Sequence, residues 1–139
     1  MGRGYGLVES FVPRRGWTVV NVGANIGCFT LWAVLHMQQG QLWAFEPIPT
    51  TFGYLERNIH DNQHRVPSVS IEAQAYAIAE TEDTLSMLAV AESTGWNRLI
   101  AGEAIAKERL PIVQVPAKPL DSLIPDAPID LFKVDVEGA

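Results

Sequence analysis

The sequence has little cysteine and no long apolar run. Cys28 is the single cysteine among 139 residues, which excludes an internal disulfide framework and a metal site built from paired thiols. It lies in an apolar stretch, so we expect a buried structural thiol rather than a nucleophile. This stretch, residues 28–37, is far below the roughly 20 residues that a membrane span needs. No signal segment opens the chain, and we expect a cytoplasmic protein.

Basic residues are also scarce. The chain has 10 Lys and Arg against 16 Asp and Glu, a formal net charge of −6. Such a surface repels nucleic-acid backbones and anionic membranes, so neither is expected as a main partner. With 47% apolar and 19% charged residues, the composition is that of one globular domain. We assign residues 1–16 to an N-terminal lead-in and residues 17–139 to a cofactor-binding half-domain.

Apolar strand patterns alternate with helical patterns along the chain. Main strands are predicted at residues 17–22, 41–46, about 69–75 and 129–136, and helices at 25–38 and 50–62. The third strand alternates apolar and polar residues, which suggests an edge position. Shorter strands are predicted at 84–90 and 112–115, on either side of a segment, 92–110, that is hard to assign. This alternation predicts an α/β fold with a parallel sheet and crossover helices.

Glycines follow the first strand, and an acidic residue ends the second. Gly23 and Gly27 let the backbone turn sharply and approach a ligand, and Glu46 can accept hydrogen bonds from both hydroxyls of a ribose. The pattern indicates a nucleoside-cofactor site. A dinucleotide fingerprint needs a further glycine where Cys28 stands, so the spacing favours a smaller cofactor without phosphate, such as S-adenosylmethionine. A nicotinamide-dependent oxidoreductase is the alternative enzyme.

An ordered set of segments carries a family resemblance. They are residues 20–27 (VNVGANIG), 44–47 (AFEP), 55–58 (LERN), 119–122 (PLDS) and 129–138 (IDLFKVDVEG). Together they resemble the FkbM family of S-adenosylmethionine-dependent methyltransferases, with one departure at Asn21, where the family pattern usually has Asp. The resemblance implies a Rossmann-like methyltransferase fold with a mostly parallel sheet and helices on both faces. It also implies O-methylation of a small-molecule hydroxyl on a sugar, lipid or secondary metabolite.

The resemblance and the positions of the strand ends give a set of cofactor-binding residues. The loop backbone would hold the methionine part, Asn21 its amino group and Glu46 the ribose, with the end of the third strand along the adenine. The predicted residues are Asn21, Gly23, Ala24, Asn25, Gly27, Glu46 and Ala77. Asn21 could instead cap a turn and Glu46 could be a solvated strand-end carboxylate. Asn58 lies opposite the apolar stripe of its helix and is predicted to be structural or exposed.

Two carboxylates follow the fourth main strand. Ligands of open parallel sheets lie at the carboxyl ends of the strands, so Asp135 and Glu137 could accept a hydroxyl proton, position the acceptor or hold a divalent cation. Capping of a following helix is the structural alternative. We favour Asp135 as the catalytic acid or base, with Glu137 in support. No metal site is predicted, and Lys133 is expected to be partly buried and paired with a carboxylate.

The last residue follows closely on the fourth main strand. A seven-stranded methyltransferase sheet would need about 80–100 further residues, so the sequence predicts the N-terminal part of a domain, truncated after the fourth main strand. Such a chain would expose an apolar strand edge, through which two copies could pair. A degenerate fragment that binds a nucleoside without catalysis is therefore a further alternative.

Overall fold

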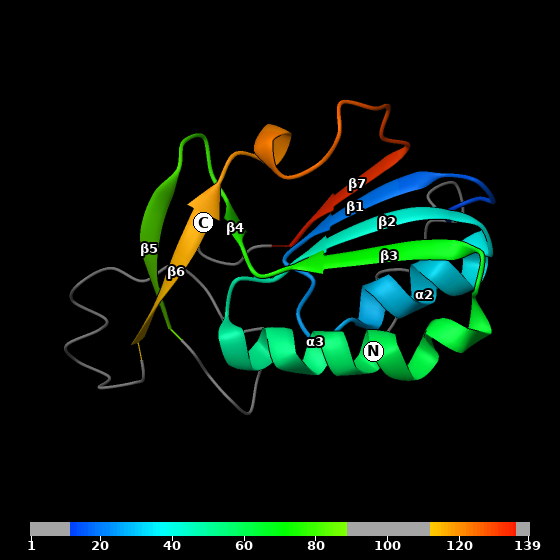
Figure 1. Cartoon of the computed structure of the whole chain (residues 1–139), viewed down its shortest axis with the longest axis horizontal. Helices are drawn as coiled ribbons and strands as arrows, with labels where there is room; N and C mark the ends of the chain where they lie inside the picture. The colour runs from blue at the N-terminus through cyan, green and yellow to red at the C-terminus, as the bar shows by residue number, and fades with distance from the viewer. Residues whose placement is uncertain (1–11, 89–111, 136–139) are drawn as a thin grey trace.

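The computed structural model describes residues 12–88 and 112–135. Its strands form two sheets (Figure 1), and its helices are two α-helices and two short 3-10 helices. In chain order the elements are β1 (Thr18–Val22), α2 (Cys28–Met37), β2 (Gly40–Phe45), α3 (Pro49–Asn62), η2 (Gln63–Arg65), β3 (Val69–Gln74), β4 (Ala77–Ile78), β5 (Asp83–Leu88), β6 (Ile112–Lys118), η4 (Leu120–Ser122) and β7 (Leu131–Val134).

The main sheet is parallel and has the strand order β3-β2-β1-β7. Its register aligns the last residues of the strands, because Val22 pairs with both Phe45 and Val134, and Phe45 pairs with Gln74. The segments that follow these strands therefore leave the sheet at one edge. The predicted α/β class with a mostly parallel sheet is confirmed, as is the edge position of the third strand.

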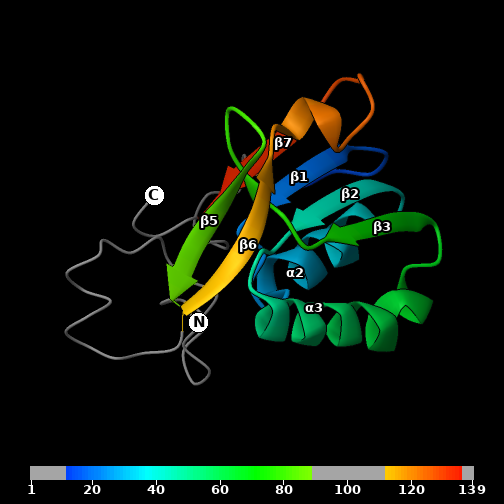
Figure 2. The same cartoon turned by 60° about the vertical axis from the view of Figure 1, so that its left-hand side comes forward.

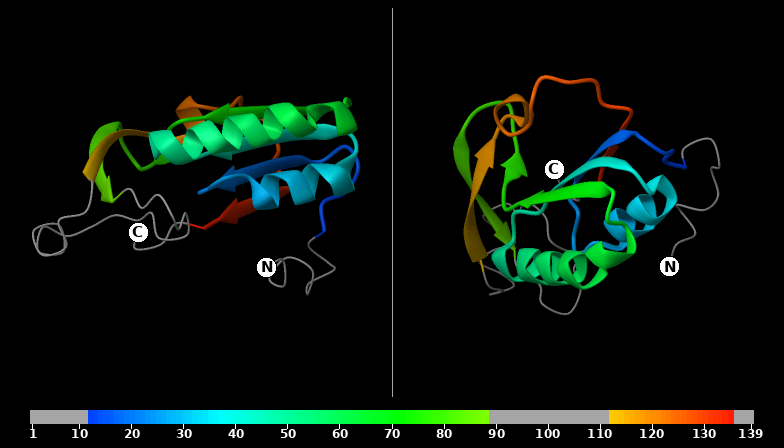
Figure 3. Two further views of the ribbon diagram at one scale, coloured as in Figure 1. Left: turned by 90° about the horizontal axis from the view of Figure 1, so that it is seen from below. Right: turned by 45° about the vertical axis from the view of Figure 1, so that its right-hand side comes forward.

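The two faces of the sheet have different coverings. On one face, α2 and α3 lie side by side (Figure 3) and enclose a core to which Val19, Leu42 and Leu55 contribute. On the other face, Val20 and Phe45 pack against apolar side chains from η4 and the connection to β7. This alternation follows the period of two along a strand. The sheet is thus flanked by α-helices on one face and by a 3-10 helix on the other.

Helix α2 differs from its prediction in two ways. It begins at Cys28 rather than at residue 25, because Asn25 and Gly27 have φ angles of 55° and 103°, which a right-handed helix cannot include. Cys28 is exposed, so the expectation of a buried thiol was wrong. Because the helix is apolar on nearly every side, periodicity could not identify the outward face.

Helix α3 agrees closely with its prediction. Pro49 lies in the first turn, where its fixed φ suits a helix and its missing N–H is not needed. Leu55 is fully buried, and Phe52 and Ile59 pack against the same core, which confirms the predicted stripe. Among the described residues, no helix is both long enough and apolar enough to cross a membrane.

The second sheet has the order β4-β6-β5 and lies beyond the carboxyl ends of the main strands (Figures 1 and 2). β5 and β6 are antiparallel, and β4 and β6 are parallel. Met87 and Val115 from this sheet form a buried cluster with Ile48. β5 and β6 correspond to the two predicted short strands, although β6 continues to Lys118, whereas β4 was not predicted. Residues 89–90 and the segment 92–110 lie outside the described residues.

Candidate functional site

The loop between β1 and α2 has an unusual backbone. Gly23, Asn25 and Gly27 all have positive φ, at 80°, 55° and 103°. A Cβ at Gly23 would collide with the backbone carbonyl of Asp135, whose carbon atom would be 2.9 Å away. Residue 23 must therefore be glycine both for its dihedral angle and for the close approach of β7.

The amides of Gly23, Ala24, Asn25 and Gly27 in this loop are hydrogen-bonded within the protein. The amides of Gly23 and Ala24 both donate to the carbonyl oxygen of Phe45, at 2.9 Å each, and the Gly27 amide donates to the Ala24 oxygen at 3.0 Å. The predicted role of Gly23, Ala24 and Gly27 in holding the methionine part is not tested by these bonds.

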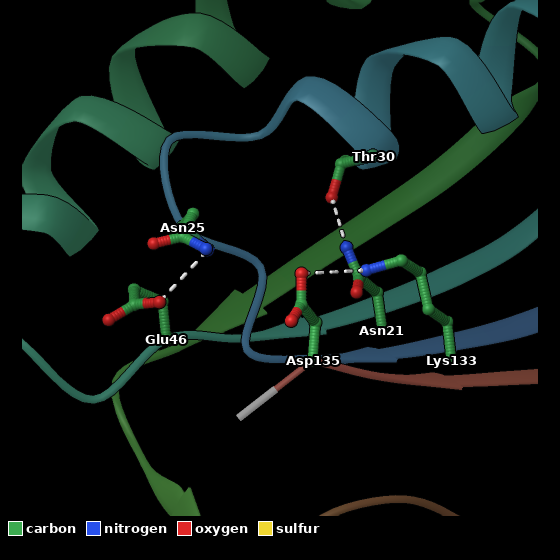
Figure 4. A network of polar contacts seen from close by, with 6 residues as sticks. All are labelled: Asn21, Asn25, Thr30, Glu46, Lys133 and Asp135. Atoms are coloured by element: carbon green, nitrogen blue, oxygen red, sulfur yellow. Dashed lines mark hydrogen bonds and ion pairs between the residues drawn. The ribbon is translucent and has the colours of Figure 1, made fainter. Parts of the chain in front are cut away.

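Glu46 follows directly after β2 and faces this loop (Figure 4). Its Oε1 accepts a hydrogen bond from the Asn25 amide at 2.9 Å, and its Oε2 accepts one from the Ile48 amide at 3.1 Å. The residue is 3% exposed, so the alternative of a solvated carboxylate was wrong. Burial raises the pKa of Glu46 above its ordinary 4.5, and the two backbone hydrogen bonds act in the opposite direction.

Asn21 is fully buried near the end of β1. Its Nδ2 donates to Thr30 Oγ1 of α2 at 3.1 Å, whereas its Oδ1 has no hydrogen-bond partner among the described residues. Because Asn21 is paired inside the sheet with Ala44 and Lys133, the alternative of a turn cap was wrong. A buried acceptor without a donor is destabilising by about 1–3 kcal/mol, which makes this oxygen notable.

Asp135 follows directly after β7. Its amide donates to the Val22 oxygen at 2.9 Å, and its half-exposed carboxylate lies 3.5 Å from Lys133 Nζ (Figure 4). Lys133 is 19% exposed and its ammonium lies 5.0 Å from the ring centroid of Phe29, as expected for a partly buried, paired lysine. Glu137 lies outside the described residues. Where the chain is described, no three potential metal-ligating side chains are grouped together.

The remaining predicted residue, Ala77, belongs to the second sheet. It pairs with Ala117 of β6 and packs against the buried cluster that contains Ile48. Of the predicted residues, Asn21, Asn25, Glu46 and Asp135 lie together at one edge of the main sheet (Figure 4). Ala77 lies further along the chain, after the turn that follows β3.

Two residues that contact the site were not predicted as part of it. Thr30 accepts the hydrogen bond from Asn21, and Asn58 of α3 donates from Nδ2 to the Ile26 oxygen at 2.6 Å. Asn58 was predicted to be structural or exposed, and it is half-buried. The available sequence signal was that Asn58 belongs to segment 55–58 of the family resemblance. It lies three residues after buried Leu55, beside the apolar stripe rather than opposite it.

The parallel sheet flanked by α2 and α3, with a glycine loop after β1 and an acidic residue after β2, defines a Rossmann-like methyltransferase fold. Residues 21–139 match the methyltransferase FkbM domain. The chain belongs to this family of methyltransferases, which confirms the resemblance seen in the sequence.

Two curated relatives are themselves named as methyltransferases. Methyltransferase 1 of Beauveria bassiana (strain ARSEF 2860) is 31% identical, with 87% of this chain and 54% of that protein covered. Methyltransferase sdnD of Sordaria araneosa is 29% identical, with 87% of this chain and 56% of that protein covered. The chain thus spans about half the length of these relatives. No solved structure matches it.

Proposed function

We propose that this chain forms the S-adenosylmethionine-binding part of a methyltransferase that acts on a hydroxyl group of a sugar, lipid or secondary metabolite. Membership of the FkbM family supports methyl transfer, and the loop and Glu46 support the choice of cofactor. The observation that carries the proposal is the position of the Glu46 carboxylate, which bridges from the end of β2 to the Asn25 amide of the loop.

The capacity of Glu46 for hydrogen bonds fits a ribose. A carboxylate has about four acceptor sites, and two of them are used by the amides of Asn25 and Ile48. The remaining capacity matches the two hydroxyls of a ribose, which donate well to a charged acceptor. Glu46 is thus the residue proposed to hold the sugar, with Ala77 and its neighbours after β3 near the base.

Asn21 fits a cationic donor. Its buried Oδ1 lacks a hydrogen-bond donor among the described residues, and an ammonium group such as that of a methionine moiety can provide one. A neutral amide gives a weaker hydrogen bond than the Asp of the family pattern would. Because Asn21 is fully enclosed, contact with a ligand requires the surrounding side chains to open.

The chemistry of the reaction places modest demands on the protein. S-Adenosylmethionine supplies a methyl group already activated on a sulfonium, so the chain must align the acceptor hydroxyl and exclude water. Asp135 is the proposed residue that accepts the hydroxyl proton, because it lies after β7 at the same edge as the loop and is half exposed. Glu137 is proposed to support it.

Isothermal titration calorimetry tests the cofactor assignment. We expect heat of binding with S-adenosylmethionine and S-adenosylhomocysteine and none with NAD. Glu46→Ala should weaken binding by ~1.5–3 kcal/mol, because the ribose hydrogen bonds are lost. Glu72→Ala is the matched control, since Glu72 is an exposed acid on β3, and it should leave the affinity unchanged.

Three outcomes would contradict the proposal. Binding of NAD alone would favour the oxidoreductase alternative. No heat of binding with any of the three ligands would favour a fragment without a cofactor. An unchanged affinity in Glu46→Ala would remove Glu46 from the site. Circular dichroism of Glu46→Ala is needed beside the titration, because loss of the Asn25 and Ile48 hydrogen bonds also destabilises the fold.

A further inference from the structure

Helix α3 contacts the loop between β1 and α2 at two consecutive residues. Asn58 Nδ2 donates a hydrogen bond to the carbonyl oxygen of Ile26 at 2.6 Å. The next residue, Gly27, lies against fully buried Leu55, whose Cδ1 would be 3.0 Å from a Cβ at that position. The end of the loop, at Ile26 and Gly27, is therefore fixed by α3.

The hydrogen bond from Asn58 acts where the loop is most strained. The Ile26 carbonyl belongs to the peptide unit before Gly27, and residues 25 and 27 on either side both have positive φ. Asn25 is not a glycine, although Asn enters this left-handed region more readily than most other side chains do. Glu46 holds the Asn25 amide, and Asn58 holds the Ile26 carbonyl.

We propose that Asn58 is a positioning residue, which holds the loop of residues 23–27 in its binding conformation before the cofactor arrives. The proposal rests on the proposed function, and it adds a residue that does not itself touch the cofactor. A loop that is already ordered loses less conformational entropy on binding, so the affinity is higher. Without the bond to Ile26, part of the binding free energy would be used to order the loop.

Asn62 provides a matched control on the same helix. It is also half-buried, and its Nδ2 also donates to a backbone carbonyl, that of Asn58 at 2.8 Å. This bond stays within α3 and does not reach the loop. Asn58→Ala and Asn62→Ala thus each remove a bond from Nδ2 to a backbone carbonyl, and only the first frees the loop. Asn62→Ala also removes an exposed bond from Arg65 to Asn62 Oδ1, so it is the harsher change for the helix itself. Asn58→Asp keeps the side-chain shape and removes the donor.

Two measurements test the proposal. In titrations with S-adenosylhomocysteine, both Asn58 variants should bind about five- to tenfold more weakly than the unmodified protein, while Asn62→Ala should stay within about twofold. In hydrogen exchange without any ligand, the amides of Asn25 and Gly27 should exchange about tenfold faster in the Asn58 variants. Both amides are hydrogen-bonded, to Glu46 and Ala24, so their protection can be measured.

The exchange measurement separates this proposal from the proposed function. If the unmodified protein binds no S-adenosylhomocysteine, the cofactor assignment fails, and loop exchange still decides whether Asn58 anchors the loop. Unchanged exchange in the Asn58 variants would overturn the inference. Exchange that rises equally in the loop and in β2 would also overturn it, because it would show general destabilisation instead of a released loop.

Discussion

The loop after β1 and the chain segment after β7 are neighbours at one edge of the sheet, but they are built differently. In the loop, the amides of Gly23, Ala24, Asn25 and Gly27 are all hydrogen-bonded, and Glu46 behind them is buried. After β7, the Asp135 carboxylate is half exposed and is paired with Lys133. A fixed, enclosed loop suits recognition of a ligand, whereas an exposed carboxylate suits contact with an acceptor that enters from solvent.

The strands that support the two regions differ in the same way. β1 lies inside the main sheet between β2 and β7, and its residues are almost entirely buried. β7 is the outer strand of the described sheet, and its Phe132 and Val134 are 47% and 57% exposed. Pairing of two copies through this edge stays a prediction. The region proposed to bind the cofactor is thus supported by more of the described structure than the region proposed for catalysis.

The largest expected effect comes from the contact that joins the two regions. Gly23→Ala should destabilise the protein by about 2–5 kcal/mol, because it adds both the strain of a positive φ and a clash with the Asp135 backbone. Gly16→Ala is the control, since Gly16 has a φ of +84° and nothing within 4 Å of its added Cβ. It should lose about 1–2 kcal/mol.

Urea unfolding of the two glycine variants gives the comparison directly. A much larger loss in Gly23→Ala would show that the loop and β7 are held in contact. Equal losses would show that Gly23 is needed for its dihedral angle alone, and that the loop and the segment after β7 are independent.

Several features of these regions were predictable from sequence because their signals are local. The alternation of strands and helices gave the parallel sheet, and the glycines before α2 and the acid after β2 marked the site. The start of α2 was misplaced because Asn tolerates a left-handed conformation but does not require one, so Asn25 gave only a weak signal that the helix begins later.

The missed contacts depend on residues that are far apart in the chain. Asn58 meets Ile26 across 32 positions, and no local pattern links them. The side-chain oxygen of Asn21, which has no hydrogen-bond partner in residues 12–88 and 112–135, likewise depends on where α2 places Thr30, which only packing determines. The exposure of Cys28 could not be predicted either, because the sequence of an all-apolar helix does not indicate which face packs against the sheet.

A pH titration of stability sharpens the contrast in burial. The folded pKa of Glu46 is raised by burial, so the native state keeps this proton to a higher pH than the unfolded chain does. Stability should therefore fall as the pH rises from about 4.5 through the raised pKa, and then level off. Glu46→Gln has no such proton and should lack this component of the fall.

The measurement is the unfolding free energy of both proteins in urea between about pH 4 and pH 8. The unmodified protein should lose stability relative to Glu46→Gln over that range. A relative gain would mean that the hydrogen bonds from Asn25 and Ile48 outweigh the effect of burial, and that the folded pKa lies below the ordinary value.

The smallest effect is expected after β7. Lys133→Met keeps an apolar side chain but removes the ammonium, and with it the ion pair with Asp135 and the contact over the Phe29 ring. The stability should change by about 1 kcal/mol, because the partner carboxylate is half exposed and burial of the ammonium is itself costly. The unfolding midpoint in urea, measured at low and at high salt, checks this. A loss well above that value, insensitive to salt, would mean that Lys133 is as integral to the core as Glu46 is. The contrast between an enclosed loop and an open segment after β7 would then no longer hold.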